Sequence, residues 1–298
     1  MNKLVQCVPN FSEGRDKDKI EKIIDCFRGK DGVKLLDYSS DKDHNRSVVT
    51  LVGEPNEVEK AMIEAFGVAI ELIDMTKHEG QHPRMGAVDV CPFIPIKNMD
   101  INEAKELAEK LAKEVSEKYN LPIFLYEKSA TAAHRQNLAK IRKGQFEGMA
   151  DKIKEEDWKP DYGQGEIHPT AGVTAIGARM PLVAFNVLLD TSNLEIANKI
   201  ARCVRHISGG LRYCKAIGID MPERGITQVS MNMTDYTKTP LYRVFELIRI
   251  EAKRYGVNVV GSEVIGLVPM DVFINIGEYY LGIEGFNPSQ VLEKNLME

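Results

Sequence analysis

Apolar and polar residues follow two different periods along the first third of this chain. Alternation and short β-branched runs, typical of strands, occur at residues 4–8, 33–36 and 47–52, and a longer apolar run fills 88–96. Between them, apolar residues recur at helical spacing over 20–27, up to Gly29, and again from Pro55, a residue suited to the first turn of a helix. The predicted order is therefore strand, helix, strand, strand, helix, strand.

The last third of the chain repeats this order. Strands are predicted at 182–189, 214–219 and 226–233, and a last strand region begins at 257. The sequence SNLE at 192–195 is a capping box that starts the first helix of this half. A second helix follows Pro240 and ends at Gly256, and a final helix runs from about Asp271.

Two copies of the β-α-β-β-α-β order predict an α+β fold made of two ferredoxin-like subdomains, each with an antiparallel sheet. The first copy carries extra material, namely a helix near 102–118, a strand at 123–126 and an irregular region over 129–165. We place the boundary near Met180, which gives domains of residues 1–180 and 181–298. A ligand cleft is expected between them, because pockets gather at subdomain junctions.

Composition narrows the class of protein. The 298 residues are 43% hydrophobic and 28% charged, as in ordinary globular proteins, and the net charge of −5 argues against a general nucleic-acid binder. No apolar run is long enough to span a bilayer, and the N-terminus lacks the apolar core of a signal peptide. The five cysteines are sparse and lack CxxC spacing, so we expect buried thiols in a reducing cytoplasm.

The densest group of chemically capable residues is HEGQHPRMG at 78–86, directly before the long apolar strand. A proline disfavours the α conformation in the residue before it, so His82 lies on a turn. Histidine titrates near neutral pH, which suits general acid–base catalysis. His78 and His82 are also a candidate zinc pair, although Gly80 and Pro83 interrupt the helix that such a pair needs. A third interpretation is that these histidines only satisfy surface hydrogen bonds.

A second candidate region is PDYGQGEIHPTAG at 160–172. Its glycines let the backbone approach a ligand closely, so the segment is either a ligand-lining loop or an ordinary linker between the two halves. It lacks the context of a dinucleotide fold and the lysine of a P-loop. Arginine grips carboxylates with two parallel hydrogen bonds, which makes four arginines on turns candidates for holding such groups. They are Arg46, Arg84, Arg179 and Arg212.

Three motifs carry a resemblance to a known family. CVPNFSEG at 7–14, HPRMG at 82–86 followed by DVCPFIP at 89–95, and IGLVP at 265–269 resemble the glutamate formiminotransferase family. That family includes the formiminotransferase half of formiminotransferase-cyclodeaminase. The resemblance implies a transferase of histidine degradation that moves a formimidoyl group between N-formimidoyl-L-glutamate and N5 of tetrahydrofolate. It further implies a homodimer, two ferredoxin-like subdomains that hold the folate between them, and no metal.

The resemblance also assigns roles by position. It makes His82 the catalytic histidine, and we expect Arg84 to help position substrate carboxylates. The mammalian branch would have an acidic residue where this chain has Ser39, so an acid that orients the histidine would be sought among Asp37, Asp41 and Asp43. The resemblance implies that folate is lined by Gly163, Gln164, Gly165, Glu166, Ile167, His168, Pro169, Thr170, Ala171 and Gly172, and from their chemistry we expect Arg84 and Arg46 to bind substrate or folate carboxylates.

Two other functions remain open at this point. One is a related folate-dependent one-carbon transferase that uses formylglutamate, 5-formyltetrahydrofolate or formiminoglycine. The other is a metal-dependent hydrolase built around His78 and His82.

Overall fold

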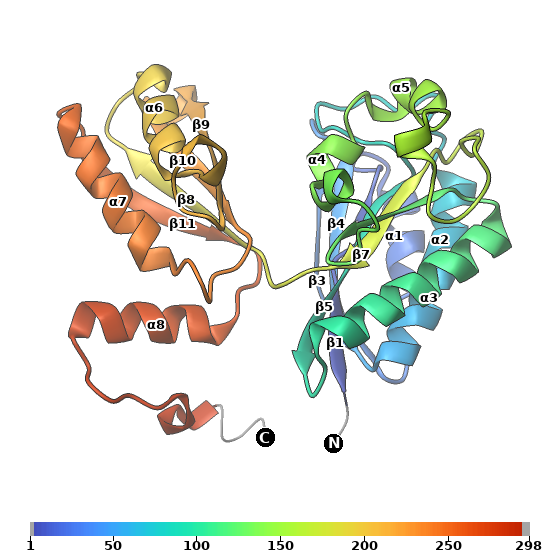
Figure 1. The fold of residues 1–298 in the computed structure, drawn as a ribbon, viewed down its shortest axis with the longest axis horizontal. Coiled ribbons are helices and arrows are strands. Elements are labelled where there is room, and N and C mark those ends of the chain that lie inside the picture. Colours follow the sequence, from blue (N-terminus) through green and yellow to red (C-terminus); the bar gives the residue numbers. More distant parts are fainter. Residues whose placement is uncertain (1–2, 294–298) are drawn as a thin grey trace. The chain divides into compact units, whose positions relative to one another are not determined.

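Two separate β-sheets organise the chain in the computed structural model, which describes residues 3–293 (Figure 1). Each sheet belongs to its own unit, Met1–Arg179 or Met180–Glu298. Helices accompany both sheets. The predicted α+β class with two sheet-containing subdomains is therefore confirmed.

The first unit contains the predicted order of elements and then continues with further helices and strands. Its elements are β1 (Leu4–Cys7), β2 (Asn10–Phe11), α1 (Lys17–Asp25), β3 (Val33–Asp41), β4 (Arg46–Gly53), α2 (Pro55–Leu72), β5 (Val88–Lys97), α3 (Ile101–Tyr119), β6 (Ile123–Glu127), η1 (Ala133–Gln136), α4 (Leu138–Ile141), α5 (Gln145–Lys152), η2 (Glu156–Trp158) and β7 (Thr174–Ala178). The region expected to be irregular thus holds short helices, and β7 is a strand that the sequence pattern does not predict.

The sheet of the first unit is mixed. β1 and β2 succeed one another between β4 and β5 and are antiparallel to both, while β3 pairs with the other edge of β4. Beyond β5 come β7 and then β6, and these pairings are parallel. The prediction of an antiparallel sheet is wrong here. The reason is α3, a helical crossover after β5 that returns the chain to the same end of the sheet and so favours parallel pairing.

Apolar side chains cover the β5–β7–β6 part of this sheet on both faces. On one face α3 contributes Leu111, which belongs to the main core together with Ile23 of α1. On the other face a smaller cluster joins Phe124 of β6 to Ile141 and Met149 of α4 and α5. Each such side chain, when fully buried, stabilises the fold by about 1.5–3 kcal/mol. β5 is accordingly a buried, rigid support for the loop that precedes it.

The second unit follows the predicted element order. Its elements are β8 (Val183–Leu189), α6 (Leu194–Val204), η3 (His206–Ser208), β9 (Cys214–Met221), η4 (Pro222–Arg224), β10 (Ile226–Met233), α7 (Leu241–Arg254), β11 (Val259–Ile265), α8 (Met270–Leu281) and η5 (Pro288–Gln290). The strands lie in the order β11-β8-β10-β9, and each pairing is antiparallel, as predicted.

One predicted detail of this unit is wrong. The first helix is capped by Asn193, whose side chain accepts a hydrogen bond from the backbone N–H of Glu195. With the cap at 193, Glu195 is the second helical residue and cannot take the third position that a capping box requires.

The cysteines are free thiols in the part of the chain that the structure describes. Cys7, Cys26, Cys91 and Cys214 are buried, as expected, whereas Cys203 is exposed. Within residues 3–293, no helix combines the length and the apolarity that crossing a bilayer requires.

Candidate active site

The predicted site residues of the first unit come from three connections that meet at one edge of its sheet. β4, β5 and β7 run in the same direction, because β2 is antiparallel to both β4 and β5, and β7 is parallel to β5. The segments that lead into these strands therefore lie at the same edge. We call them the His44 turn (residues 42–45), the histidine loop (78–87) and the glycine loop (163–172).

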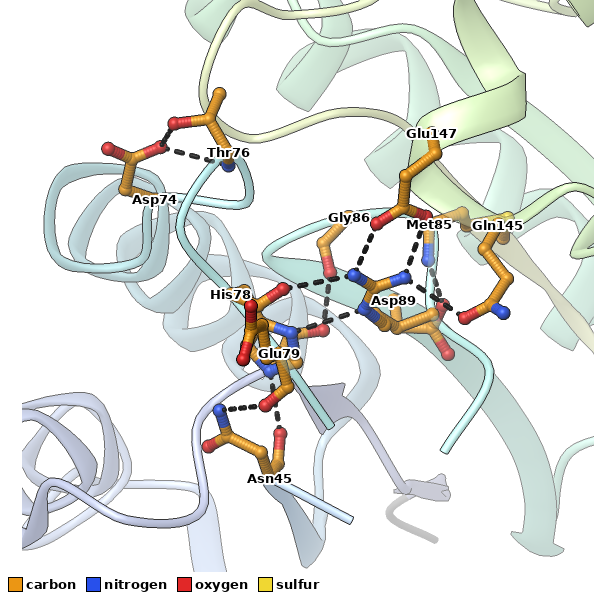
Figure 2. A network of polar contacts seen from close by, with 12 residues as sticks. Asn45, Asp74, Thr76, His78, Glu79, Met85, Gly86, Asp89, Gln145 and Glu147 are labelled. Carbon is orange, nitrogen blue, oxygen red and sulfur yellow. Dashed lines mark hydrogen bonds and ion pairs between the residues drawn. The ribbon is translucent and has the colours of Figure 1, made fainter. Parts of the chain in front are cut away.

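The His44 turn and the histidine loop are tied together by hydrogen bonds. The Asn45 side chain donates to the carbonyl of Glu79 at 2.9 Å, and Nε2 of His78 lies 2.9 Å from the carbonyl of Asn45 (Figure 2). The backbone N–H of Gln81 donates to the carbonyl of Asp43 at 3.0 Å. A Cβ added at Gly80 would lie 2.3 Å from the carbonyl oxygen of His44, so only glycine allows this approach. The two segments behave as one structural piece.

His82 lies beside the first residue of β4. Its Nε2 is 2.7 Å from Nη1 of Arg46. A guanidinium only donates, so Nε2 accepts and the ring proton sits on Nδ1. Nδ1 is buried and has no hydrogen-bond partner among the described residues. Burial, together with the positive charges of Arg46 and Arg142, lowers the pKa of His82 to about 3. The imidazole is therefore neutral at pH 7 and able to accept a proton.

The acid sought for orienting His82 is not in contact with it. Within residues 3–293, no carboxylate hydrogen bonds to the His82 ring, and Ser39 only pairs with Val48 across the β3–β4 ladder. Of the three candidate acids, Asp41 instead holds His44, with 3.2 Å between its Oδ2 and the Nδ1 of that histidine. The edge of the His44 ring faces His82, with 6.0 Å between ring centroids.

Arg84 has a different position from the one expected of a substrate-binding arginine. Only 7% of it is exposed, and its Nη1 and Nη2 donate to the two carboxylate oxygens of Glu147 at 2.9 and 2.6 Å. It also donates to Gln145 and, through Nε, to the ring of His78 (Figure 2). The hydrogen bond from Arg84 lowers the pKa of Glu147, which keeps the pair ionised. These contacts occupy the guanidinium in joining the histidine loop to α5, so we do not place Arg84 against a substrate.

Arg142, which the sequence did not mark as a site residue, adds a positive charge to the site. Asp89 is 1% exposed, accepts a hydrogen bond from the backbone N–H of Met85 at 2.9 Å, and forms an ion pair with Arg142. Nε of Arg142 is buried without a hydrogen-bond partner in the described chain. The surrounding KIRKG sequence is typical of a solvated basic turn and gives no hint of this pairing. Arg142 and Arg46 both act on His82 electrostatically.

The glycine loop has an exposed half and a fixed half. Residues 163–166 are exposed. Towards β7, His168 and Gly172 exchange backbone hydrogen bonds of 3.0 Å, and the carbonyl of Ala171 accepts from Ala87 of the histidine loop at 2.9 Å. Gly172 has φ +71°, and an added Cβ would lie 2.3 Å from the carbonyl oxygen of Met85. Two sequence-predicted segments, some eighty positions apart, are thus brought together by the insertion of β7 beside β5.

Two histidines of these loops are taken up by internal contacts. His168 Nδ1 accepts from the backbone N–H of Ala171 at 3.0 Å, and burial lowers the pKa of this histidine. Nε2 of His78 hydrogen bonds to the carbonyl of Asn45, and its Nδ1 accepts a hydrogen bond from Arg84. Both ring nitrogens are therefore occupied, and His78 does not pair with His82 as a metal ligand. Within residues 3–293 no group of three or more His, Cys, Asp or Glu side chains has the arrangement of a metal site.

Known proteins resemble this chain along its whole length. Residues 4–179 match the N-terminal subdomain of the formiminotransferase domain, and residues 184–295 match the formiminotransferase domain. The glutamate formimidoyltransferase of Streptococcus pyogenes serotype M1 is 56% identical over 298 residues, which is 100% of both chains. That of Thermoplasma acidophilum is 44% identical over 295 residues, 98% of this chain and 97% of its own. Formimidoyltransferase-cyclodeaminase of Dictyostelium discoideum is 44% identical over 291 residues, 95% of this chain and 54% of its own.

Proposed function

The chain belongs to the formiminotransferase family, and from that membership we propose that it is a glutamate formimidoyltransferase. The reaction moves the formimidoyl group, –CH=NH, between N-formimidoyl-L-glutamate and N5 of tetrahydrofolate, and we assign it to histidine degradation. The observation that carries the proposal is the 56% identity, over all 298 residues, with a protein named for this activity. It confirms the resemblance noted in the sequence.

The first unit offers surroundings that suit a folate. The co-substrate supplies the N5 amine that takes up the formimidoyl group. A cavity of about 420 Å³ borders the exposed half of the glycine loop and is lined by Gly163, Gly165, Lys154 and Lys159, among others. The open glycine backbone suits a flat molecule because it allows close approach, and Lys154 and Lys159, which here pair with Asp151 and Glu156, are donors that its carboxylates could engage instead. We propose that residues 163–166 contact the folate, and that residues 167–172 shape the loop from behind.

His82 is proposed as the general base. A nitrogen that has bonded to the formimidoyl carbon carries positive charge and is strongly acidic, so a weakly basic imidazole is able to take its proton. The neutral state of His82 at pH 7 leaves that capacity available. Nε2 is the acceptor atom, since Nδ1 carries the ring proton, and Arg46 gives up this nitrogen when the substrate arrives.

The arginines of the site divide into two roles. Arg46 and Arg142 bring positive charge to the immediate surroundings of His82, and we propose that Arg46 also attracts the substrate carboxylates. Arg84 acts as a positioning residue, because its pairing with Glu147 fixes the histidine loop. Holding both substrates against such a prearranged site removes translational freedom, which contributes to the rate independently of proton transfer.

We further propose that the enzyme is a cytoplasmic homodimer. The free thiols described above suit a reducing compartment. The dimer follows from the family resemblance, and light scattering on the purified protein measures it directly.

The central experiment compares wild type with His82→Asn in an assay of formimidoyl transfer. Asparagine keeps the polar character of the side chain but cannot exchange a proton, so kcat should fall by about 10²–10⁴-fold. The affinity for tetrahydrofolate should stay within a few-fold. Near-normal turnover of this variant would remove His82 from its role. Running N-formimidoyl-glutamate beside N-formyl-glutamate and formiminoglycine decides between the proposed donor and its relatives.

A further inference from the structure

A second imidazole lies next to His82 and has no role in the mechanism described so far. His44 occupies the turn between β3 and β4, and its ring lies edge-on to that of His82, with 6.0 Å between centroids and 78° between planes. Its Nδ1 is 3.2 Å from Oδ2 of Asp41. A carboxylate that orients an imidazole is an arrangement that enzymes use for proton transfer.

The position of His44 is fixed by its neighbours. Oδ1 of Asp41 accepts the backbone N–H groups of Asp43 and His44 at 2.9 and 2.8 Å, which closes the turn. These hydrogen bonds lower the pKa of Asp41, with that of His44 as the largest cause, and so keep the carboxylate charged. The carbonyls of Asp43 and His44 face Gln81 and Gly80 of the histidine loop. His44 and His82 therefore keep their separation as parts of one structural piece.

The two imidazoles differ in what they offer to a reacting molecule. Asp41 holds the Nδ1 proton of His44, so Nε2 is the nitrogen left for exchange, and it has no hydrogen bond within residues 3–293. The side chain of His44 is 47% exposed, which gives substrate and water access to it. His82 is more buried, and positive charge surrounds it. His44 is thus an accessible ring paired with a carboxylate and placed to deliver a proton, whereas the neutral ring of His82 is placed to accept one.

We propose, on the basis of the formimidoyl transfer argued above, that the Asp41–His44 pair is the second acid–base group of this active site and protonates the departing nitrogen. In the forward reaction, the bond between N5 and the formimidoyl carbon forms, and His82 takes the proton that N5 loses. The bond from the same carbon to the glutamate nitrogen then breaks, and His44 supplies the proton that this nitrogen gains. One proton then passes from His82 to His44, directly or through water, and restores both rings. No oxidant, metal or further co-reactant is needed.

The titratable and charged groups around the rings of His44 and His82 come from several neighbouring segments. They are Asp41 at the end of β3, Arg46 on β4, His82 on the histidine loop, Asp89 on β5 and Arg142 after α4. Of these, Asp41 is the one whose carboxylate pairs directly with the ring of His44.

The test is a set of pH–rate profiles for wild type, His44→Asn, Asp41→Asn and Asp43→Asn. Wild type should show a bell-shaped kcat profile, whose alkaline limb reports the acid. His44→Asn should lose that limb and about 10²-fold in kcat, with KM for both substrates within threefold and an unchanged melting temperature. Asp41→Asn keeps the oxygen that closes the turn but removes the charge, so its alkaline limb should move to lower pH. Imidazole added to His44→Ala should restore part of the rate.

Asp43→Asn is the matched control. It is a carboxylate on the same turn, and its side chain makes no hydrogen bond or ion pair among the described residues, so its profile should equal that of wild type. If His44→Asn keeps the wild-type profile, the inference is wrong while the proposed function stands. If the wild-type protein itself does not transfer the formimidoyl group, the proposed function is wrong, and the inference that rests on it fails with it.

Discussion

Gly172 offers the sharpest test of how the glycine loop is joined to the histidine loop. We consider its replacement by alanine. Its φ of +71° lies in the left-handed region, where a side chain costs about 1–2 kcal/mol. The new Cβ would also lie 2.3 Å from the carbonyl oxygen of Met85. The two backbones must then separate and weaken the 3.1 Å hydrogen bond from Val173 to Met85, at a further cost of about 0.5–1.5 kcal/mol.

The expected loss for Gly172→Ala is therefore about 2.5 kcal/mol, which for a unit of this size lowers the melting temperature by roughly 5–10 °C. Gly165→Ala is the matched control, because it lies in the same loop, has no positive φ and has open space around its Cβ position. It should change stability by less than about 0.5 kcal/mol. Calorimetry on both variants measures the difference. Equal melting temperatures within 2 °C would show that the contact between the two loops is not as described.

Three further outcomes are expected. Asp89→Asn removes the partner of Arg142 in a nearly dry place and should cost about 2–3 kcal/mol in denaturant unfolding, while Asp89→Asn combined with Arg142→Gln should recover part of this loss. For His82, the folded-state pKa of about 3 lies below the unfolded value of about 6.5, so folded protein binds fewer protons between these pH values and loses stability as pH falls through 6.5. The full pKa difference would lower the free energy of unfolding by about 2 kcal/mol at pH 5, and the partial exposure of His82 reduces this loss to about 1 kcal/mol. The variant His82→Gln should lack this loss when its unfolding is compared at pH 8 and pH 5. Gly165→Trp should fill the adjoining cavity and weaken tetrahydrofolate binding about tenfold with little change in stability, and calorimetric titration giving an unaltered affinity would place the folate elsewhere.

Local sequence patterns predicted most of the elements because those elements are amphipathic by themselves. The apolar run at 88–96 became β5, and the face formed by residues 20–27 became the buried side of α1. β7 was missed since Thr174–Ala178 is short and its small residues give no strand period; it becomes a strand through pairing with β5 and β6. The same pairing makes the first sheet mixed, and such non-local partners leave no mark in a single sequence.

In the candidate site, too, local features could be predicted from the sequence and long-range contacts could not. His82 was predicted from local chemistry, because a histidine before proline at the start of a strand is conspicuous. The burial of Arg84 could not be predicted, since it depends on Glu147, which lies 63 positions away. The ion pair between Asp89 and Arg142 could not be predicted either, because these residues lie 53 positions apart. His44 lies between two predicted strands and carries no motif of its own, and its nearness to His82 follows from the shared direction of β4 and β5.

The division of the glycine loop into an exposed half and a fixed half has a consequence for engineering and for evolutionary drift. Residues 164–166 are exposed and tolerate exchange, whereas Gly163 has φ +96° and lies close to Pro122, so libraries confined to residues 164–166 would retune the preferred pterin or tail length of the proposed folate. Residues 168–172 are bonded to the segment that carries the base, so changes there would disturb chemistry and recognition together. New substrate preferences should therefore arise by sampling three positions, with the proposed proton-transfer residues left unchanged.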